Sequence, residues 1–273
     1  GSIMFNKYVV ILFLFCFSTI IHAGVSLSHY RIEFEPNQRL QHLYLFNPSE
    51  EAQTYRISLV DMEMKPDGRL EQSEGVKNSA KKYVRISPRQ IKIAPNGNQT
   101  IKLLARNSHR LDVGELRSHL LLTEVPKETA NDINQALENS LGDDEVSVGL
   151  HMTTSLSIPV FVRKVPSINT QVALDSYSFI KKDNQLSLSM QFNRYGNTSV
   201  YSDIDVYADK DNEPIAMLRS MGFYYPLTQR TVNLNLDKWD GHSPLKLVVK
   251  RHETEQIFVS EDLSLVSALA AIH

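Results

Sequence analysis

The sequence has little cysteine, little tryptophan and no excess of basic residues. One cysteine among 273 residues excludes a disulfide framework and any zinc or iron–sulfur site built from several cysteines. Lys and Arg number 29 against 31 for Asp and Glu, which argues against a protein whose main partner is nucleic acid. Glycine and proline, 11 each, are too few for a fibrous or low-complexity chain. What remains is the composition of an ordinary folded protein.

Catalytic and metal-binding motifs are also missing from the sequence. The nine histidines form no H-x-H or HExxH pattern, so we interpret them as surface or structural residues. There is no GxSxG motif, phosphate-binding loop or EF-hand loop. Trp239, Tyr224 and Tyr225 are a candidate sugar-binding set, although isolated aromatic residues more often serve packing. We therefore expect no enzymatic activity, no cofactor and no metal site.

One long apolar run is present, and it lies near the N-terminus. Lys7 precedes an uninterrupted apolar stretch from Tyr8 to Phe17, and Ala23 provides a small residue for cleavage. This order is typical of a secretory signal peptide, here residues 1–23 with a short extension before the first methionine. A membrane anchor is the alternative, but the apolar run falls short of the ~20 residues that a span needs. We expect export after cleavage.

The rest of the chain alternates apolar and polar residues with a period of two, broken by Pro, Gly and Asn. This pattern predicts many short strands, and short strands at such spacing are typical of all-β sandwiches or barrels. We expect strands within residues 25–34, 43–47, 55–64, 84–87, 90–106, 116–125, 185–192, 202–209, 230–236 and 244–251. Residues 127–145 differ: they are polar and acidic, and we expect a long loop with one or two helical turns.

A domain boundary is predicted at residues 163–167. This segment follows a strand, contains a proline, and precedes a second set of alternating residues. The division gives an N-terminal β-sandwich at 24–164 and a C-terminal one at 165–273, both within the usual size range of domains.

The predicted strand at 146–163 is unusually long. Its even-numbered residues from Val146 to Val162 are apolar except Thr154, while the odd-numbered ones are mostly polar or small. Eighteen extended residues would cover about 59 Å. An edge strand with so much apolar surface either pairs with another chain or becomes an aggregation hazard. The alternative is two ordinary strands with a bend near Ser155 or Pro159.

Several segments together resemble the periplasmic pilus-assembly chaperones of the chaperone–usher pathway, in particular their non-classical branches. The most specific element is the run of prolines, aliphatic residues and glutamine within 85–106. The segments that carry the resemblance are VSLSHYRIEF (25–34), LYLFNPS (43–49), RISPRQIKIAPNGNQTIKLLAR (85–106), GELRSHLLL (114–122), SLSIPVFVR (155–163) and FNRYGNTSVYSDIDVY (192–207).

This resemblance implies two immunoglobulin-like domains set at an angle and a mechanism of donor-strand complementation. The chaperone lends an edge strand to a pilus subunit that lacks its last strand, and then passes the subunit to an outer-membrane usher. The edge would be occupied by a subunit or, in the free protein, by a second copy of the chaperone. The resemblance also implies that the side chains donated to the subunit are those of Val148, Leu150, Met152, Thr154, Leu156 and Ile158.

Two arginines are the candidate anchors for the C-terminal carboxylate of the subunit. Arg31 matches the family's cleft arginine, and a guanidinium can bond both carboxylate oxygens. The family usually adds a lysine on the long strand, but this chain has Pro159 at that position. Arg163, four residues further on the same face, is the candidate replacement.

A function of another class is also consistent with the composition. A secreted β-sandwich adhesin or glycan-binding module would share the signal peptide and the strand pattern. It should, however, blunt or bury the edge at 146–162 and remain a stable monomer.

Overall fold

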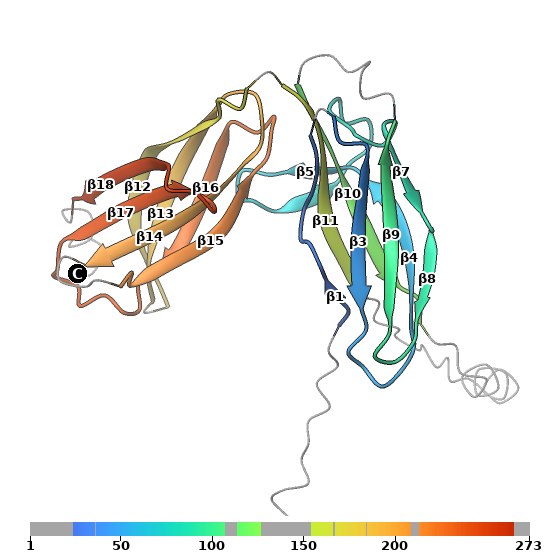
Figure 1. The fold of residues 1–273 in the computed structure, drawn as a ribbon. Helices are drawn as coiled ribbons and strands as arrows, with labels where there is room; N and C mark the ends of the chain where they lie inside the picture. The colour runs from blue at the N-terminus through green and yellow to red at the C-terminus, as the bar shows by residue number, and fades with distance from the viewer. Residues whose placement is uncertain are drawn as a thin grey trace, which may run out of the picture.

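The structure is a computed structural model that describes residues 24–35, 37–106, 114–126, 154–165, 167–183, 185–208 and 213–264. Its regular secondary structure in these ranges consists of strands only, which gather into two β-sandwiches set at an angle (Figure 1). The predicted all-β class with two β-sandwiches set at an angle is thus confirmed. The described segments contain no helix with the length and apolar character needed to span a bilayer.

The first sandwich consists of a four-stranded sheet, in the order β1-β3-β9-β7, and a five-stranded sheet, in the order β2-β11-β10-β4-β8. All pairs in these two sheets are antiparallel except β2 with β11. The strands are β1 (Ser26–Leu27), β2 (Ile32–Phe34), β3 (Leu40–Phe46), β4 (Gln53–Val60), β7 (Val84–Ser87), β8 (Gln90–Ile93), β9 (Asn98–Ala105), β10 (Gly114–Glu124) and β11 (Ser155–Lys164).

Alternation along these strands builds the core of the first sandwich. Leu43 and Leu45 of β3 face inward with Leu103 of β9, and they meet Leu120 and Leu122 of β10 from the other sheet. All five side chains are fully buried. Because strand residues two apart share a face, the period of two in the sequence becomes one continuous apolar layer.

The second sandwich has a three-stranded sheet, β12-β13-β16, and a four-stranded sheet, β15-β14-β17-β18. Its core contains Phe192, Ile204, Phe223 and Leu247, again from alternate strand positions of both sheets. The strands are β12 (Gln171–Lys182), β13 (Gln185–Tyr195), β14 (Val200–Ala208), β15 (Ala216–Phe223), β16 (Gln229–Asn235), β17 (Leu245–Arg251) and β18 (Ile257–Leu263).

A short hairpin connects the two sandwiches in space. Its strands are β5 (Met62–Met64) and β6 (Leu70–Gln72), and Figure 1 shows it reaching from the first sandwich toward the second. The amide of Thr231 in β16 donates a hydrogen bond of 2.7 Å to the carbonyl of Pro66 in the hairpin turn. The hairpin therefore belongs to the first sandwich and contacts the second.

Most predicted strands lie where the alternation placed them. The sequence analysis did not predict β6, β12, β15 or β18, each of which has at least two exposed residues in succession. The predicted loop at 127–145 lies outside the described residues.

The three aromatic residues singled out in the sequence do not form one site. Trp239 stacks on Phe179 with ring centroids 5.9 Å apart, inside the second sandwich. Tyr224 instead packs with Met64 and Phe161 at the junction of the two sandwiches. The interpretation of Trp239 as a packing residue therefore fits its position.

Candidate functional site at the junction of the sandwiches

Strand β11 lies next to the edge of its sheet and is only partly covered. On one side it pairs with β10 along its whole length, from Ser155 to Lys164. On its other side β2 pairs with only three residues, 160–162. Among the described residues, the backbone from Ser155 to Pro159 therefore has a strand neighbour on one side only. This open edge is where a further strand could be added.

The inward face of β11 belongs mainly to the first sandwich itself. Ile158 is 2% exposed and packs in the core together with Val160 and Val162. Leu156 is half-buried against the same core. This differs from the expected role of Ile158 as a donated side chain, because a residue that fills its own core is not free to fill a partner's groove.

The predicted donor residues that come earlier in the chain are either exposed or outside the described residues. Thr154 is exposed, and its carbonyl accepts a hydrogen bond of 3.0 Å from the amide of Glu124. Val148, Leu150 and Met152 lie outside the described residues. The described structure thus covers only the last part of the predicted 146–163 strand.

The opposite face of β11 is covered by the second sandwich. Phe161 is fully buried and makes edge contacts with Tyr201 and Tyr224, with ring centroids 6.4 and 5.8 Å away. The sequence pattern predicted a polar or small face here. A large aromatic residue on that face is explained by the junction, which only the tertiary structure creates.

Arg163 is buried in this junction and is already paired with acids of its own chain. Its side chain is 6% exposed, its Nε donates to Glu115 at 2.7 Å, and its Nη1 donates to Glu33 at 2.6 Å. Burial disfavours the charged guanidinium, but the two carboxylates outweigh that effect and raise the pKa of Arg163. A partner's carboxylate would have to displace one of them, so this geometry does not leave Arg163 free as the second anchor.

Arg31 lies in the same junction but is more accessible. Its Nη2 donates to Glu253 of the second sandwich at 2.9 Å, and its Nε lies 3.3 Å from Glu33. Its guanidinium also lies over the ring of Tyr201, 4.8 Å from the centroid. Its side chain is 31% exposed, so a ligand from solvent can reach it.

The structure brings the two predicted anchors together through Glu33, which contacts both guanidinium groups. The chain of contacts continues from Arg163 to Glu115, whose carboxylate accepts a bond from the amide of Ser199 in the second sandwich at 3.1 Å. The pairs of Arg163 with Glu115 and Glu33 lie within the first sandwich, and two contacts join this network to the second sandwich: the hydrogen bond from Ser199 to Glu115 and the ion pair of Arg31 with Glu253.

Strand β10 supplies residues that the sequence analysis did not single out as functional. Glu115, Arg117 and His119 stand at alternate positions, so they share the face of β10 that meets the second sandwich. In the sequence, ionisable residues at every second position of a strand whose other face is mainly apolar indicate that both faces are covered. This pattern could have pointed to an interface.

Among the described residues, no group of three or more His, Cys, Asp or Glu is placed to hold a metal ion.

Comparison with known proteins gives structural matches only. No protein-family model matches this chain, and neither does any curated protein. The solved YadV chaperone has a TM-score of 0.45 and 13% identity, covering 88% of this chain and 100% of that one. A second match is the CsuC–CsuE chaperone–tip adhesion subunit pre-assembly complex, from archaic chaperone–usher Csu pili of Acinetobacter baumannii. Its TM-score is 0.45 and its identity 13%, and the match covers 88% of this chain and 97% of that one. The Pseudomonas aeruginosa CupB2 chaperone has a TM-score of 0.45 and 12% identity, and the match covers 87% of this chain and 97% of that one. The chain is thus similar to solved structures of chaperones, one of them from a chaperone–usher pilus system.

Proposed function

We propose that this protein is a periplasmic chaperone that binds pilus subunits by lending them an edge strand and delivers them to an outer-membrane usher. The observation that carries the proposal is the open edge of β11 from Ser155 to Pro159. This edge leads back along the chain into 146–154, where the alternation of apolar residues continues. A subunit that lacks one strand would pair with this edge through backbone hydrogen bonds.

In this proposal the donated side chains are Val148, Leu150, Met152 and Thr154, with Leu156 at the margin. Ile158 is left out because it fills the chaperone's own core. Burying one aliphatic side chain contributes about 1.5–3 kcal/mol before the costs of association are subtracted. Three such side chains are sufficient to hold a subunit, whereas a polar Thr154 would require a shallow or polar pocket in the partner.

Arg31 is the proposed anchor for the C-terminal carboxylate of the subunit. It is accessible from solvent, and the aromatic ring of Tyr201 beneath it fixes the plane of its guanidinium. A carboxylate arriving from a partner would replace the exposed Glu253 and leave the contact with Glu33 in place.

The first test is co-purification with a candidate pilus subunit from periplasmic extracts of cells that express the full chain. We expect one subunit to be recovered per chaperone. The double variant Leu150→Glu, Met152→Glu should lose the subunit because it would place two charges in the partner's apolar groove. The matched control is Leu40→Glu, Tyr44→Glu, which changes two exposed residues of β3 and should keep the subunit.

Each result has a direct meaning for the proposal. If the charged donor variant stays folded and still binds the subunit as well as the control does, strand donation from 146–154 is wrong. If the wild-type protein is recovered alone and as a monomer, the adhesin or glycan-binding function becomes the better explanation.

A second test concerns the anchor and its internal competitor. Glu253→Gln removes the carboxylate that occupies Arg31, so we expect several-fold tighter binding of the subunit. Arg31→Gln should weaken binding by at least tenfold, since a charge-assisted hydrogen bond is lost. Titration of each variant with purified subunit measures both effects. Weaker binding by Glu253→Gln would contradict the anchor role of Arg31.

A further inference from the structure

Buried polar atoms without partners gather on one side of the junction between the sandwiches. Among the described residues, nine buried side-chain nitrogen or oxygen atoms have no hydrogen-bond partner. Six of these atoms belong to three residues: Nε and Nη1 of Arg117, both ring nitrogens of His119, and Nε and Nη1 of Arg230. Burying a polar atom without a partner costs free energy, so this side of the junction is the expensive one to keep closed.

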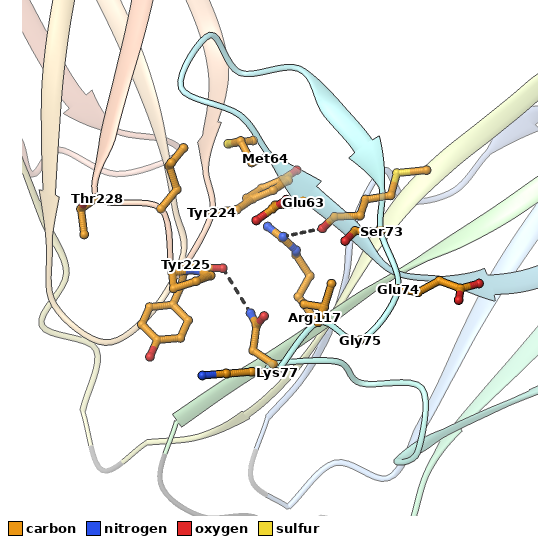
Figure 2. Close-up of a pocket in the computed structure, with 15 residues that line it drawn as sticks. Glu63, Met64, Ser73, Glu74, Gly75, Lys77, Arg117, Tyr224, Tyr225 and Thr228 are labelled. Carbon is orange, nitrogen blue, oxygen red and sulfur yellow. Dashed lines mark hydrogen bonds between the residues drawn. The ribbon is translucent and has the colours of Figure 1, made fainter.

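The two β10 residues face the second sandwich through Tyr224. The guanidinium of Arg117 lies over the Tyr224 ring at 4.4 Å, and the ring of His119 is 6.0 Å from it. Figure 2 shows the side chain of Arg117 between the hairpin and Tyr224. Its Nη2 donates to the carbonyl of Met62 at 2.8 Å, which is a contact within the first sandwich.

Arg230 of β16 is covered by the tip of the β5–β6 hairpin. Its guanidinium lies so close to Gly68 that a Cβ atom there would be 2.3 Å from Nη2. Gly68 has a φ of +85°, in the left-handed region that favours glycine. The hairpin therefore shields this guanidinium from water without giving Nε or Nη1 an acceptor.

The same side of the junction is incompletely packed. A pocket of about 530 Å³ separates residues 73–78 from residues 224–228, with Arg117 at its inner end (Figure 2). Two hydrogen bonds cross here: Asn78 Nδ2 donates to the carbonyl of Tyr225 at 3.2 Å, and the amide of Thr231 donates to Pro66 at 2.7 Å. Both lie in turns or loops, where bonds break at low cost.

The other end of the junction is fully paired. The carboxylate of Glu115 accepts hydrogen bonds from Arg163 and from the amide of Ser199, and Arg31 is paired with Glu253. Breaking these contacts would leave buried charges without partners. This end is therefore the natural pivot.

We propose that the junction is a hinge that opens on the hairpin side, while both sandwiches stay folded and the paired end serves as pivot, and that acid favours the open form. Opening lets water reach the unpaired nitrogens. The apolar cluster of Met64, Phe161 and Tyr224 opposes it, so the closed form dominates at neutral pH. The hinge follows from the junction alone and does not depend on the chaperone function proposed above.

His119 makes this equilibrium sensitive to acid. Arg117 flanks it on the same face of β10, and Tyr224 faces it from the second sandwich. Its neighbours across the sheet, Val60 of β4 and Pro159 of β11, carry no charge. Burial and the charge of Arg117 lower the pKa of His119 in the closed form.

The acids nearest to His119 are engaged elsewhere. Glu115 is paired in the network described above, while Asp61 accepts a hydrogen bond from Ser118 at 2.6 Å and lies 3.6 Å from Nζ of Lys81. In the open form, in water, His119 takes up a proton below pH 6.5 that the closed form does not hold. The ratio of open to closed molecules should therefore rise about tenfold per pH unit below 6.5.

The test measures distances between pairs of spin labels by pulsed electron paramagnetic resonance at pH 7.5, 5.5 and 4.5. The full chain carries Cys16→Ser, so that only introduced cysteines are labelled. Glu74→Cys with Thr228→Cys spans the pocket, and His29→Cys with Glu255→Cys spans the pivot; all four positions are exposed. Across the pocket we expect a second, longer distance that grows as the pH falls, whereas the pivot pair and the far-ultraviolet circular dichroism stay unchanged.

Two variants tie the opening to the unpaired groups. His119→Met should remove the growth of the longer distance in acid, because no proton is taken up on opening. Arg117→Met should lower the open fraction at every pH, because the closed form then buries one charge fewer. His42→Met, on the outer face of β3, is the matched control and should behave like the wild type.

Three results would overturn the proposal. One is a single unchanged distance across the pocket down to pH 4.5. Another is lengthening of both label pairs together, which would mean separation or unfolding instead of a hinge. The third is equal growth of the longer distance in the wild type and in His119→Met. If the methionine variant does not fold, His119→Gln, a second neutral replacement, gives the same comparison.

Discussion

At the scale of single residues, the junction depends on how each buried ionisable group is compensated. Glu115 has a guanidinium and a backbone amide as partners. Arg117 has one carbonyl and an aromatic ring. Neither ring nitrogen of His119 has a hydrogen-bond partner, and its ring lies 6.0 Å from that of Tyr224. The free-energy cost of burying these three residues therefore differs strongly, although they share one face of β10.

His119 predicts a dependence of stability on pH. Burial, together with the charge of Arg117, lowers its pKa from 6.5 to about 3. Between these values the unfolded chain binds a proton that the folded chain does not, so stability falls as the pH drops below 6.5. We expect a contribution of about 1.4 kcal/mol per pH unit within this window.

The measurement is urea unfolding of the wild type and of His119→Met at pH 7.5 and pH 4.5. The wild type should lose about 2.7 kcal/mol more than the variant on acidification, because two pH units of this interval lie below 6.5. An equal loss in both proteins would show that His119 is not held in its neutral form.

At the scale of elements, β11 divides into two parts with different tasks. Its second half is enclosed by β2, β10 and the second sandwich, and its inward side chains complete the first core. Its first half, 155–159, has an open edge, although Ile158 within it still faces the core. The single alternating pattern of the sequence therefore serves a core at one end and, by our proposal, a partner at the other.

A pair of truncations tests this division. Ile158→Ala should lower the free energy of unfolding by about 2–5 kcal/mol, because it leaves a cavity in the core. Thr154→Ala, at an exposed position only four residues earlier, should change it by less than about 0.5 kcal/mol. Denaturant unfolding of both variants checks the expectation. Similar losses at the two positions would mean that the whole strand belongs to the protein's own core.

At the scale of the whole molecule, the angle between the sandwiches is held by contacts of several kinds. Phe161, Met64 and Tyr224 form a small apolar cluster between them. The Glu115 carboxylate crosses to Ser199, and the β5–β6 hairpin crosses to Thr231. These contacts also bring the ring of Tyr201 under Arg31 and Glu253 beside it, so the surroundings of the proposed anchor exist only in the assembled molecule.

Phe161→Ala is expected to loosen this arrangement. Loss of the buried ring should cost about 3–5 kcal/mol in the free energy of unfolding and widen the distribution of angles between the sandwiches. Small-angle X-ray scattering of the folded variant measures the second effect. Phe34→Ala, in the core of the first sandwich, is the matched control and should be destabilised without a changed scattering profile. An unchanged profile for Phe161→Ala would show that the cluster does not set the angle.

Much of the architecture could be predicted from the order of residues alone. Alternation with breaks at proline and glycine predicts the all-β class and most strands, because a strand buried on one face must repeat every two residues. The unpredicted strands β12, β15 and β18 carry exposed apolar residues such as Ile180, Met217 and Ile257, which blur that repeat. Arg31 was predicted from the resemblance, and it does lie at the junction.

By itself, then, the sequence determined the all-β class and most strands, and it predicts a long strand over 146–163, because those features depend on local periodicity. Only the tertiary structure decided that Arg163 pairs inside with Glu33 and Glu115, that Ile158 fills the first core, and that Arg117 ends a pocket. Those outcomes depend on which faces meet across the junction. The contact between these faces sets which residues are buried and which charges pair, although the segments lie far apart in the chain. No local sequence pattern specifies such a contact.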